Sequence, residues 1–419
     1  MNDLLIQKAA GSRLYSSDGK VFIDLSSINS HNLIGHNIKE LNDGIACQLT
    51  KSNFSSIISL EHEPAQLLTD KLMRHIPQSS DKALEFHSSE CLAMEQAIMT
   101  VYRYWHAQHQ PKRKTIISFA HGYHGESMSC VNFNASFKNH NHFDDFLIPT
   151  EHIPYPCTWF QDKDADVKES LSLSRLNEFL SDQHLNCAAI VIEPLLQARN
   201  GMQACRPGFL NKVIEIIQDY GLLIVSDERN LSPMRSGQFF VSQYLSRCPD
   251  ILVSGSAMTN HLCPFGLTIT RDQIMAQIQS NVLLEPAGSL NQFACHAANQ
   301  TIAIIDEQIT GEHIHALQSV HMSRLHKLNK QPIIKNVRYL GSIGAFEVIC
   351  EDRSQQQKLL DWFHKRCLEY GLLLEPFHKN ICITPPLCLS TDDLHSAYDT
   401  IENIVETLPL KYITSCLDV

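Results

Sequence analysis

The segment GLLIVSDERNLSPMRSG, residues 221–237, decides the fold class of this chain. Its apolar run, 222–225, predicts a short strand buried on both faces, as in a parallel sheet. Asp227, Glu228 and Arg229 follow at the point where that strand ends. Ligands of open α/β sheets lie beyond the carboxyl ends of the strands, so these charges are candidates for a functional site. The alternative is a solvated loop after a core strand.

The composition is that of a globular protein with an acidic surface. The chain has 419 residues and a net charge of −11, which argues against nucleic acid or an anionic membrane as its main partner. Residues 1–8 lack the features of a secretory signal, and no apolar run is long enough to span a bilayer. The 14 cysteines form no CxxC pair, which favours free thiols in the cytoplasm over disulfides or structural zinc.

The N-terminal third predicts a hairpin followed by helices and a capped strand–helix junction. Asp18 and Gly19 form a turn between two alternating runs in residues 13–24. Ser88 and Ser89 are good helix caps before an amphipathic stretch that reaches Trp105, with Glu90 in its first turn. Such a junction is where α/β enzymes hold phosphate groups. The other elements expected here are helices over 38–49 and 63–76 and a strand at 84–86.

The remainder of the chain predicts alternating strands and helices and then a change of pattern near residue 305. We expect a long irregular loop over 131–165, because that region shows little periodicity. Further strands are expected at 115–119, 188–192, 251–256, 372–377 and 380–386, with an antiparallel pair in 337–348 and helices over 201–217, 354–369 and 391–406. We predict a large domain over 41–304 and a small C-terminal domain over 305–419. The N-terminal segment, 1–40, is expected to be part of the small domain.

Five stretches together resemble class III aminotransferases, which are pyridoxal-phosphate enzymes. The subgroup most similar is that of the diaminopelargonate aminotransferases of biotin biosynthesis. These stretches are DGKVFIDLSS (18–27), GYHGES (122–127), IEPLLQARNGM (192–202), VRYLGSIGAFE (337–347) and EPFHKNICITPPL (375–387).

This resemblance implies an α/β protein of the aspartate-aminotransferase type, fold type I. In that fold a large domain with a mixed, mostly parallel sheet accompanies a small α+β domain. The resemblance also implies a homodimer with its sites at the subunit interface. The family's N-terminal segment, which contributes to the substrate pocket, has no counterpart before Met1 in this sequence.

The catalytic lysine of the family has no counterpart in this chain. The family pattern P-D-I-x-x-x-G-K falls on residues 249–256, which places Ser256 at the lysine position. No lysine occurs between Lys212 and Lys327, so no neighbour can replace it. Transamination by this cofactor requires a Schiff base with a lysine, and a serine hydroxyl cannot form one. The resemblance therefore predicts a fold without its usual chemistry.

Two cofactor contacts persist beside a third that has changed. By the resemblance, Asp227 stands where an aspartate pairs with the pyridinium nitrogen, and Tyr123 stands where an aromatic ring stacks on the cofactor. Arg229 replaces the small apolar residue of the other ring face. Because Asp227 and Arg229 are two positions apart on a strand, they share a face. We expect them to pair with each other in the space of the ring.

The phosphate and substrate positions have changed as well. Glu90 and Cys91 occupy the family's phosphate-binding turn, and Ala287 replaces the threonine that reaches the phosphate across the dimer. A carboxylate about 4 Å from a phosphate charge costs on the order of 4 kcal/mol at an effective dielectric near 20. The substrate-binding arginine corresponds to Glu375. The paired tryptophans correspond to Ile28 and Asn29.

Three functions remain open at the level of sequence. The first is an aminotransferase-fold pseudoenzyme that holds no cofactor and binds a small molecule or a partner, either as a homodimer or with a catalytic paralogue. The second is an enzyme that uses cysteine and histidine in the old cleft without a Schiff base. A metal site at two clusters of histidines, His140 with His142 and His121 with His124, is not expected. The third is a working aminotransferase that transfers an amino group from S-adenosylmethionine to 8-amino-7-oxononanoate. Candidates for the second are His87, Cys91, His121, His124, Cys263, Cys295 and His296.

Overall fold

A computed structural model describes residues 4–27, 32–51, 62–76, 82–134, 147–278, 291–350 and 353–409. The chain forms two compact units. Unit 1 consists of 1–43, 234–237 and 301–419, and unit 2 of 44–233 and 238–300. The domain boundaries expected from the sequence, 40/41 and 304/305, lie a few residues from the unit divisions at 43/44 and 300/301. They remain a prediction. Within the described parts of the chain, no helix is both long and apolar enough to cross a bilayer.

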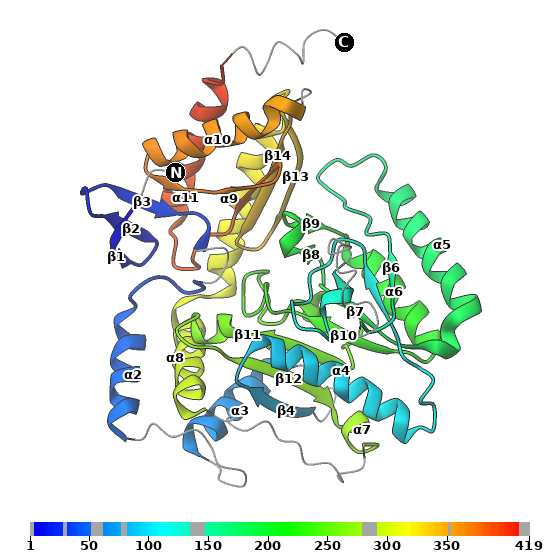
Figure 1. Ribbon diagram of the computed structural model, residues 1–419. Coiled ribbons are helices and arrows are strands. Elements are labelled where there is room, and N and C mark those ends of the chain that lie inside the picture. The colour runs from blue at the N-terminus through cyan, green and yellow to red at the C-terminus, as the bar shows by residue number, and fades with distance from the viewer. Residues whose placement is uncertain are drawn as a thin grey trace. The chain divides into compact units, whose positions relative to one another are not determined.

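Unit 2 is built on a seven-stranded sheet with strand order β4-β12-β11-β10-β7-β5-β6 (Figure 1). Strands β11, β10, β7, β5 and β6 run parallel to one another, whereas β12 is antiparallel to both β11 and β4. The strands are β4 (Lys82–His87), β5 (Thr115–Phe119), β6 (Thr150–Ile153), β7 (Cys187–Ile192), β10 (Leu223–Asp227), β11 (Ile251–Gly255) and β12 (Gly266–Arg271).

Helices cover this sheet, and short elements connect its strands. The helices are α3 (Glu63–His75), α4 (Glu90–Ala107), α5 (Ala165–Gln183), α6 (Pro207–Asp219) and α7 (Asp272–Met275). The short elements are β8 (Leu196–Gln197), β9 (Gln203–Ala204) and the 3₁₀ turns η1 (Val131–Phe133), η3 (His184–Asn186), η4 (Ala198–Asn200), η5 (Val241–Tyr244) and η6 (Ser256–Thr259). Helices α2 (Lys39–Lys51) and α8 (Gln292–Gln308) contain the unit boundaries.

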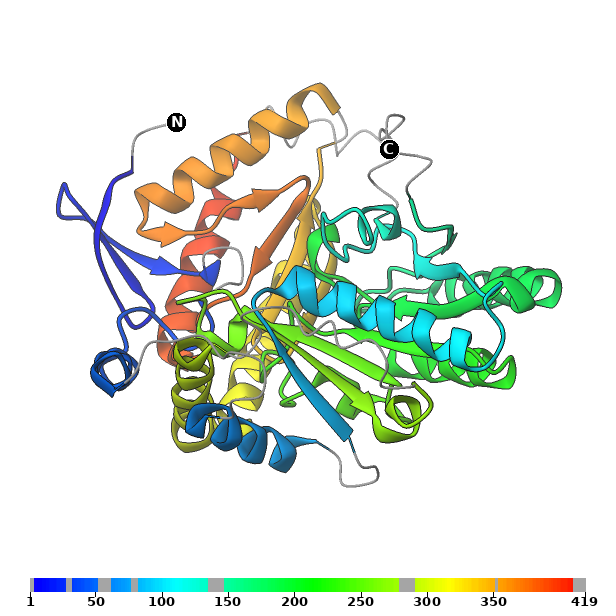
Figure 2. The same ribbon diagram turned by 60° about the horizontal axis from the view of Figure 1, so that its bottom comes forward.

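Helix α4 lies along one face of the sheet and forms the core of unit 2 with it (Figure 2). Its buried stripe includes Met94, Ile98, Val101 and Trp105, which pack against valines, alanines and isoleucines of the strands. The Trp105 indole donates a hydrogen bond to the carbonyl oxygen of Ala188 at 2.8 Å. The amphipathic spacing therefore directs this helix onto the sheet and fixes where its N-terminus lies.

Unit 1 combines two four-stranded sheets with helices. One has strand order β1-β2-β3-β15, with β3 parallel to β15, and the other has order β13-β14-β17-β16. The strands are β1 (Ile6–Ala10), β2 (Arg13–Ser16), β3 (Val21–Asp24), β13 (Ile334–Leu340), β14 (Ile343–Val348), β15 (Leu372–Leu373), β16 (Pro376–Phe377) and β17 (Asn380–Ile383). The helices are α9 (Gly311–Leu328), α10 (Arg353–Glu369) and α11 (Thr391–Glu406).

Most of the expected elements are present, but the strands β1, β6, β8, β9 and β12 and the helices α5, α7, α8 and α9 were not predicted. The hairpin of β2 and β3, the junction of β4 and α4, and the final helix at 391–406 confirm the sequence predictions. The irregular loop expected over 131–165 is wrong in part, because it contains β6 at the edge of the sheet. Strands β1 and β12 were not predicted at all. Strand β12 forms because its backbone pairs on both sides, with β11 and β4.

Candidate functional site

The charged end of β10 is buried. Asp227, Glu228 and Arg229 are 3%, 0% and 7% exposed, so the alternative of a solvated loop is wrong. Buried charges are retained in proteins when partners satisfy them. The neighbours of these three residues therefore define the candidate site.

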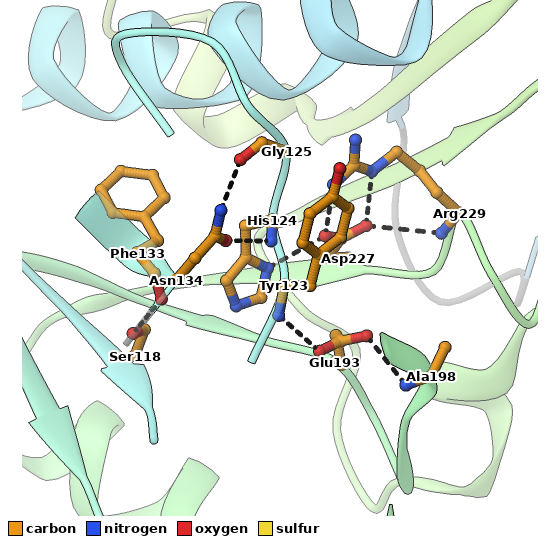
Figure 3. Close-up of polar contacts among 10 residues, drawn as sticks. All are labelled: Ser118, Tyr123, His124, Gly125, Phe133, Asn134, Glu193, Ala198, Asp227 and Arg229. Carbon is orange, nitrogen blue, oxygen red and sulfur yellow. Dashed lines mark hydrogen bonds and ion pairs between the residues drawn. The ribbon is translucent and has the colours of Figure 1, made fainter. Parts of the chain in front are cut away.

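Arg229 and Asp227 form a two-pronged ion pair with each other (Figure 3). Nε of Arg229 donates to Oδ1 of Asp227 and Nη2 donates to Oδ2, both at 2.8 Å. Oδ2 also lies 2.9 Å from Nδ1 of His124. Burial by itself would raise the pKa of Asp227, but Arg229 and His124 outweigh it and hold that pKa well below its usual range. The pairing expected from sequence is present, and His124 joins it as a third member.

Glu228 stabilises the loop that follows the strand. Its carboxylate accepts hydrogen bonds from the backbone N–H groups of Val241 and Ser242 and from the hydroxyls of Ser226 and Ser232. These contacts account for the burial of this carboxylate and anchor the turn η5. Glu228 therefore supports the site through the backbone and presents no group to a ligand.

Glu90 brings a third charge to the site from the N-terminus of α4. Ser89 caps that helix, because its hydroxyl accepts from the N–H of Leu92 at 3.2 Å. Oε1 of Glu90 accepts a hydrogen bond from the backbone N–H of Ser256 at 2.7 Å. Burial raises the pKa of Glu90, and the charge of Arg229 opposes that shift. The carboxylate thus connects the helix terminus to the end of β11.

Ser256, which the resemblance places at the lysine position, forms hydrogen bonds with its own chain. It is 7% exposed and begins the turn η6. Its hydroxyl donates to the carbonyl oxygen of Phe265 and accepts from the N–H of the same residue, both at 3.1 Å. The side chain therefore closes the loop between β11 and β12, and no amine is present at this point.

The loop that carries Tyr123 is held by a buried glutamate. Oε2 of Glu193 accepts from the N–H of Tyr123 at 2.9 Å, and Oε1 accepts from the N–H of Ala198 at 3.2 Å. Burial raises the pKa of Glu193 to about 7, and the charge of Asp227 adds to the shift while His124 opposes it. Glu193 is a site residue that was not predicted from the sequence. The Glu-Pro pair at the end of the buried strand 188–192 was the available signal.

An asparagine fixes the backbone on either side of His124. The N–H of His124 donates to Oδ1 of Asn134 at 2.7 Å, and Nδ2 of Asn134 donates to the carbonyl oxygen of Gly125 at 2.6 Å (Figure 3). Gly125 has φ +115°, a conformation that side chains rarely allow. These contacts direct the His124 ring toward Asp227. Asn134 was another residue that the sequence analysis missed.

The cysteines and histidines do not form a nucleophilic pair in the described part of the site. His124 bonds to Asp227, and Nε2 of His87 lies 3.0 Å from Oγ1 of Thr268. Burial raises the pKa of Cys263 to about 11 and that of Cys295 to about 12, so both thiols are protonated at neutral pH. His121 and Cys91 are exposed, and His296 is half-buried. The geometry gives the Cys/His enzyme hypothesis no support.

Several candidates cannot be placed at this site. Ala287, Ile28 and Asn29 lie outside the described residues. Glu375 is exposed and belongs to unit 1, between β15 and β16. Among the residues that the structure describes, no group of three or more histidines, cysteines, aspartates or glutamates is arranged to hold a metal ion.

Comparison with known proteins gives a family over nearly the whole chain. Residues 1–405 match the family described as aminotransferase class-III. The adenosylmethionine-8-amino-7-oxononanoate aminotransferase of Synechococcus elongatus is 26% identical over 411 residues, which cover 97% of this chain and 95% of that protein. The enzyme of the same name from Buchnera aphidicola subsp. Schizaphis graminum is 27% identical, with coverage of 95% and 90%.

Solved structures show the same fold. A crystal structure of adenosylmethionine-8-amino-7-oxononanoate aminotransferase from Methanocaldococcus jannaschii superposes with a TM-score of 0.86. The match covers 97% of this chain and 93% of that one at 22% identity, a level that supports the fold alone. The expected α/β architecture, of fold type I, is thus confirmed.

Proposed function

Since the chain belongs to the class III aminotransferase family, we propose that it is a pseudoenzyme of that family, without pyridoxal-phosphate chemistry, that acts by binding. The observation that carries this proposal is Ser256. Condensation of an amine with the cofactor aldehyde releases water and leaves a carbon–nitrogen double bond, and a hydroxyl cannot make that bond. The serine is also engaged by the backbone of Phe265, and no lysine occurs between Lys212 and Lys327.

The other groups of the site do not fit the cofactor either. The oxygens of Asp227 already accept from Arg229 and lie against His124, which leaves no place for a pyridinium N–H. Glu90 brings a carboxylate to the helix terminus where a phosphate would need positive potential. Both observations support a function that does not depend on this cofactor.

Binding of a partner subunit is the form of the function that we favour. In the family the sites lie at a dimer interface, so a chain without the lysine can still complete the site of a catalytic paralogue. A homodimer that binds a small molecule is the other form of the same proposal. We propose that either form acts in the cytoplasm, in keeping with 14 cysteines that include no CxxC pair.

A spectrum tests the loss of Schiff-base chemistry directly. The purified protein is mixed with excess pyridoxal phosphate, reduced with borohydride and digested for mass spectrometry. We expect no visible absorption band of a lysine Schiff base beyond that of an unrelated lysine-containing protein, and no reduced adduct at a single lysine. A stoichiometric adduct at one mapped lysine would overturn the proposal.

The competing function is the one that the relatives' names state. Both relatives described above are named adenosylmethionine-8-amino-7-oxononanoate aminotransferases. The test is growth of a biotin auxotroph that lacks the authentic enzyme and expresses this chain. We expect no growth without biotin, whereas a Synechococcus elongatus control should restore it. Growth to the level of the control would establish the aminotransferase activity.

A further inference from the structure

The ion pair of Arg229 and Asp227 has two ionisable neighbours that come from separate parts of unit 2. Asp227 lies two residues before it on β10, His124 comes from the loop after β5, and Glu90 from the start of α4. Nε and Nη2 of Arg229 face Asp227, and Nη1 lies 3.7 Å from the position that a Cβ on Gly125 would take. The guanidinium is therefore enclosed by the loops that surround the family's ring position.

The Glu90 carboxylate fills the neighbouring space at the end of β11. A Cβ added to Gly255 would lie only 2.4 Å from Oε1 of Glu90, which shows how closely the carboxylate packs on this strand. Its hydrogen bond from Ser256 holds it there. Arg229 lowers the pKa of Glu90 while Glu90 raises that of Arg229, so the two charges interact. Arg229 is thus paired with the buried carboxylate of Asp227, and its charge also acts on the half-buried carboxylate of Glu90.

We propose that Glu90, Arg229 and Asp227 together act as an internal occupant of the site, which excludes pyridoxal phosphate independently of the missing lysine. Arg229 donates the hydrogen bonds that Asp227 would otherwise accept from a pyridinium N–H, and Glu90 supplies the negative charge at the helix terminus. The inference rests on the proposed function, because it presumes that the wild-type chain has no Schiff base. It adds that the charge cluster is a second, separate barrier.

The inference predicts that restoring the lysine alone does not restore cofactor attachment. In Ser256→Lys the new ammonium would lie beside the Glu90 carboxylate, which favours its charged form. Each unit by which the lysine pKa rises lowers the fraction of reactive amine about tenfold. The phosphate would still meet the charge of Glu90. We therefore compare S256K with E90G/R229V/S256K, in which the charge cluster is also removed. S256K should show at most about a tenth of the labelling at position 256 that the triple variant shows.

The experiment compares four chains: wild type, S256K, E90G/R229V/S256K and the control E95Q/S256K. Glu95 lies on the same helix as Glu90, so E95Q removes an equal charge away from β11. Each chain is incubated with pyridoxal phosphate, reduced with borohydride, and analysed for label at position 256. Label should appear in E90G/R229V/S256K and stay low in S256K and E95Q/S256K. Equal labelling of S256K and E90G/R229V/S256K would overturn the inference and leave the proposed function intact.

A second measurement tests the charge cluster without the introduced lysine. Pyridoxamine phosphate needs no lysine, so its binding reports on the charge cluster alone. Titration calorimetry on the wild type and on E90G/R229V, with Ser256 in place, should show binding that is at least about a hundredfold tighter in the variant. Equal affinity of the two folded chains would also overturn the inference. Label at a native lysine of the wild type would instead overturn the proposed function.

Discussion

At the scale of single residues, the charge balance of the site depends on Arg229. A buried ion pair that loses one partner leaves an uncompensated charge, which costs about 3–5 kcal/mol. Here the loss would leave both Asp227 and Glu90 without their shared cation. His124 would then be the remaining side-chain partner of Asp227.

We predict that Arg229→Met lowers the free energy of unfolding by about 3–5 kcal/mol. Methionine keeps most of the side-chain volume, so the loss reports on charge and hydrogen bonds. Urea denaturation followed by circular dichroism measures it. The control is D227N/R229M, which removes the stranded carboxylate and should recover part of the loss. A change of less than about 1 kcal/mol in R229M would show that the pair adds little to stability.

Glu193 gives stability a dependence on pH with a defined sign. Its pKa is about 7 in the folded chain against an ordinary value of 4.5. Between these values the unfolded chain releases the proton while the folded chain keeps it, so the free energy of unfolding falls as pH rises. Relative to Glu193→Gln, the wild type should lose on the order of 3 kcal/mol between about pH 4 and pH 7.5.

Urea denaturation of wild type and E193Q across that range measures the difference. Glutamine resembles the protonated acid, and His124 and Asp227, whose charges act on Glu193, are present in both chains. Parallel curves for the two proteins would mean that Glu193 ionises normally in the folded state.

At the scale of elements, the site exists because α4 packs closely on β11 and β12. A Cβ on Gly266 would lie 2.3 Å from the carbonyl oxygen of Ser89, and one on Gly255 would meet the side chain of Glu90. The first obstacle is backbone and the second is a side chain. The two glycines therefore test different parts of the same contact.

We predict that Gly266→Ala and Gly255→Ala each destabilise the fold by about 1–3 kcal/mol, the usual cost of overpacking. Removing Glu90 should restore stability to G255A, in G255A/E90A, because the new methyl group meets the Glu90 side chain. It should not restore stability to G266A, because there the methyl group meets the backbone of Ser89. Thermal and urea unfolding of the four variants, including G266A/E90A, measure this. Rescue of G266A by E90A would contradict the packing described here.

The sequence predicted the elements whose signals are local. The stripe of α4 and its Ser89 cap follow from helical spacing and capping chemistry, and the buried strand before Asp227 follows from its apolar run. Strand β12 has no comparable local signal, since its pairing with β4 and β11 depends on segments far away in the chain. The edge strand β6 was not predicted for the same reason, since it pairs with β5.

The candidate site was predictable only where two residues are close in sequence. The expected contact between Asp227 and Arg229 forms, but the strand geometry behind that expectation was wrong, because β10 ends at Asp227 and Arg229 lies in the turn that follows. The contact between Glu90 and Ser256 joins residues separated by 166 positions, and it depends on the order of strands in the sheet. The roles of Glu193 and Asn134 depend on loop conformations that no periodicity describes.

At the scale of the whole molecule, one short segment shows how the chain is divided. Residues 234–237 belong to unit 1, although the chain before and after them belongs to unit 2. Arg235 in this segment is 1% exposed, and its guanidinium donates to the carbonyl oxygens of Pro385 at 3.0 Å and Asn32 at 3.3 Å. Burial lowers its pKa to about 10, opposed by Asp24, so it remains charged at neutral pH.

We predict that Arg235→Met costs about 1–3 kcal/mol of stability, because it leaves carbonyl groups of unit 1 without their donor. Hydrogen exchange should localise the effect: protection around Ser342, whose N–H donates to the carbonyl oxygen of Arg235, should fall more than protection in β7. The matched control is Arg247→Met, at an exposed side chain of unit 2. Equal loss of protection in both units would show that they do not respond separately.

The ion pair of Asp227 and Arg229 has a consequence for how much of this protein a cell can keep folded. A ligand that binds only the folded chain stabilises it by an amount that grows with the logarithm of ligand concentration. An aminotransferase that depends on its cofactor is therefore subject to nutrition, since scarcity of the vitamin lowers its folded fraction. Under the proposed function, this chain is released from that dependence, because its own Arg229 supplies the positive charge opposite Asp227. Its half-life should be the same in vitamin-starved and vitamin-fed cells.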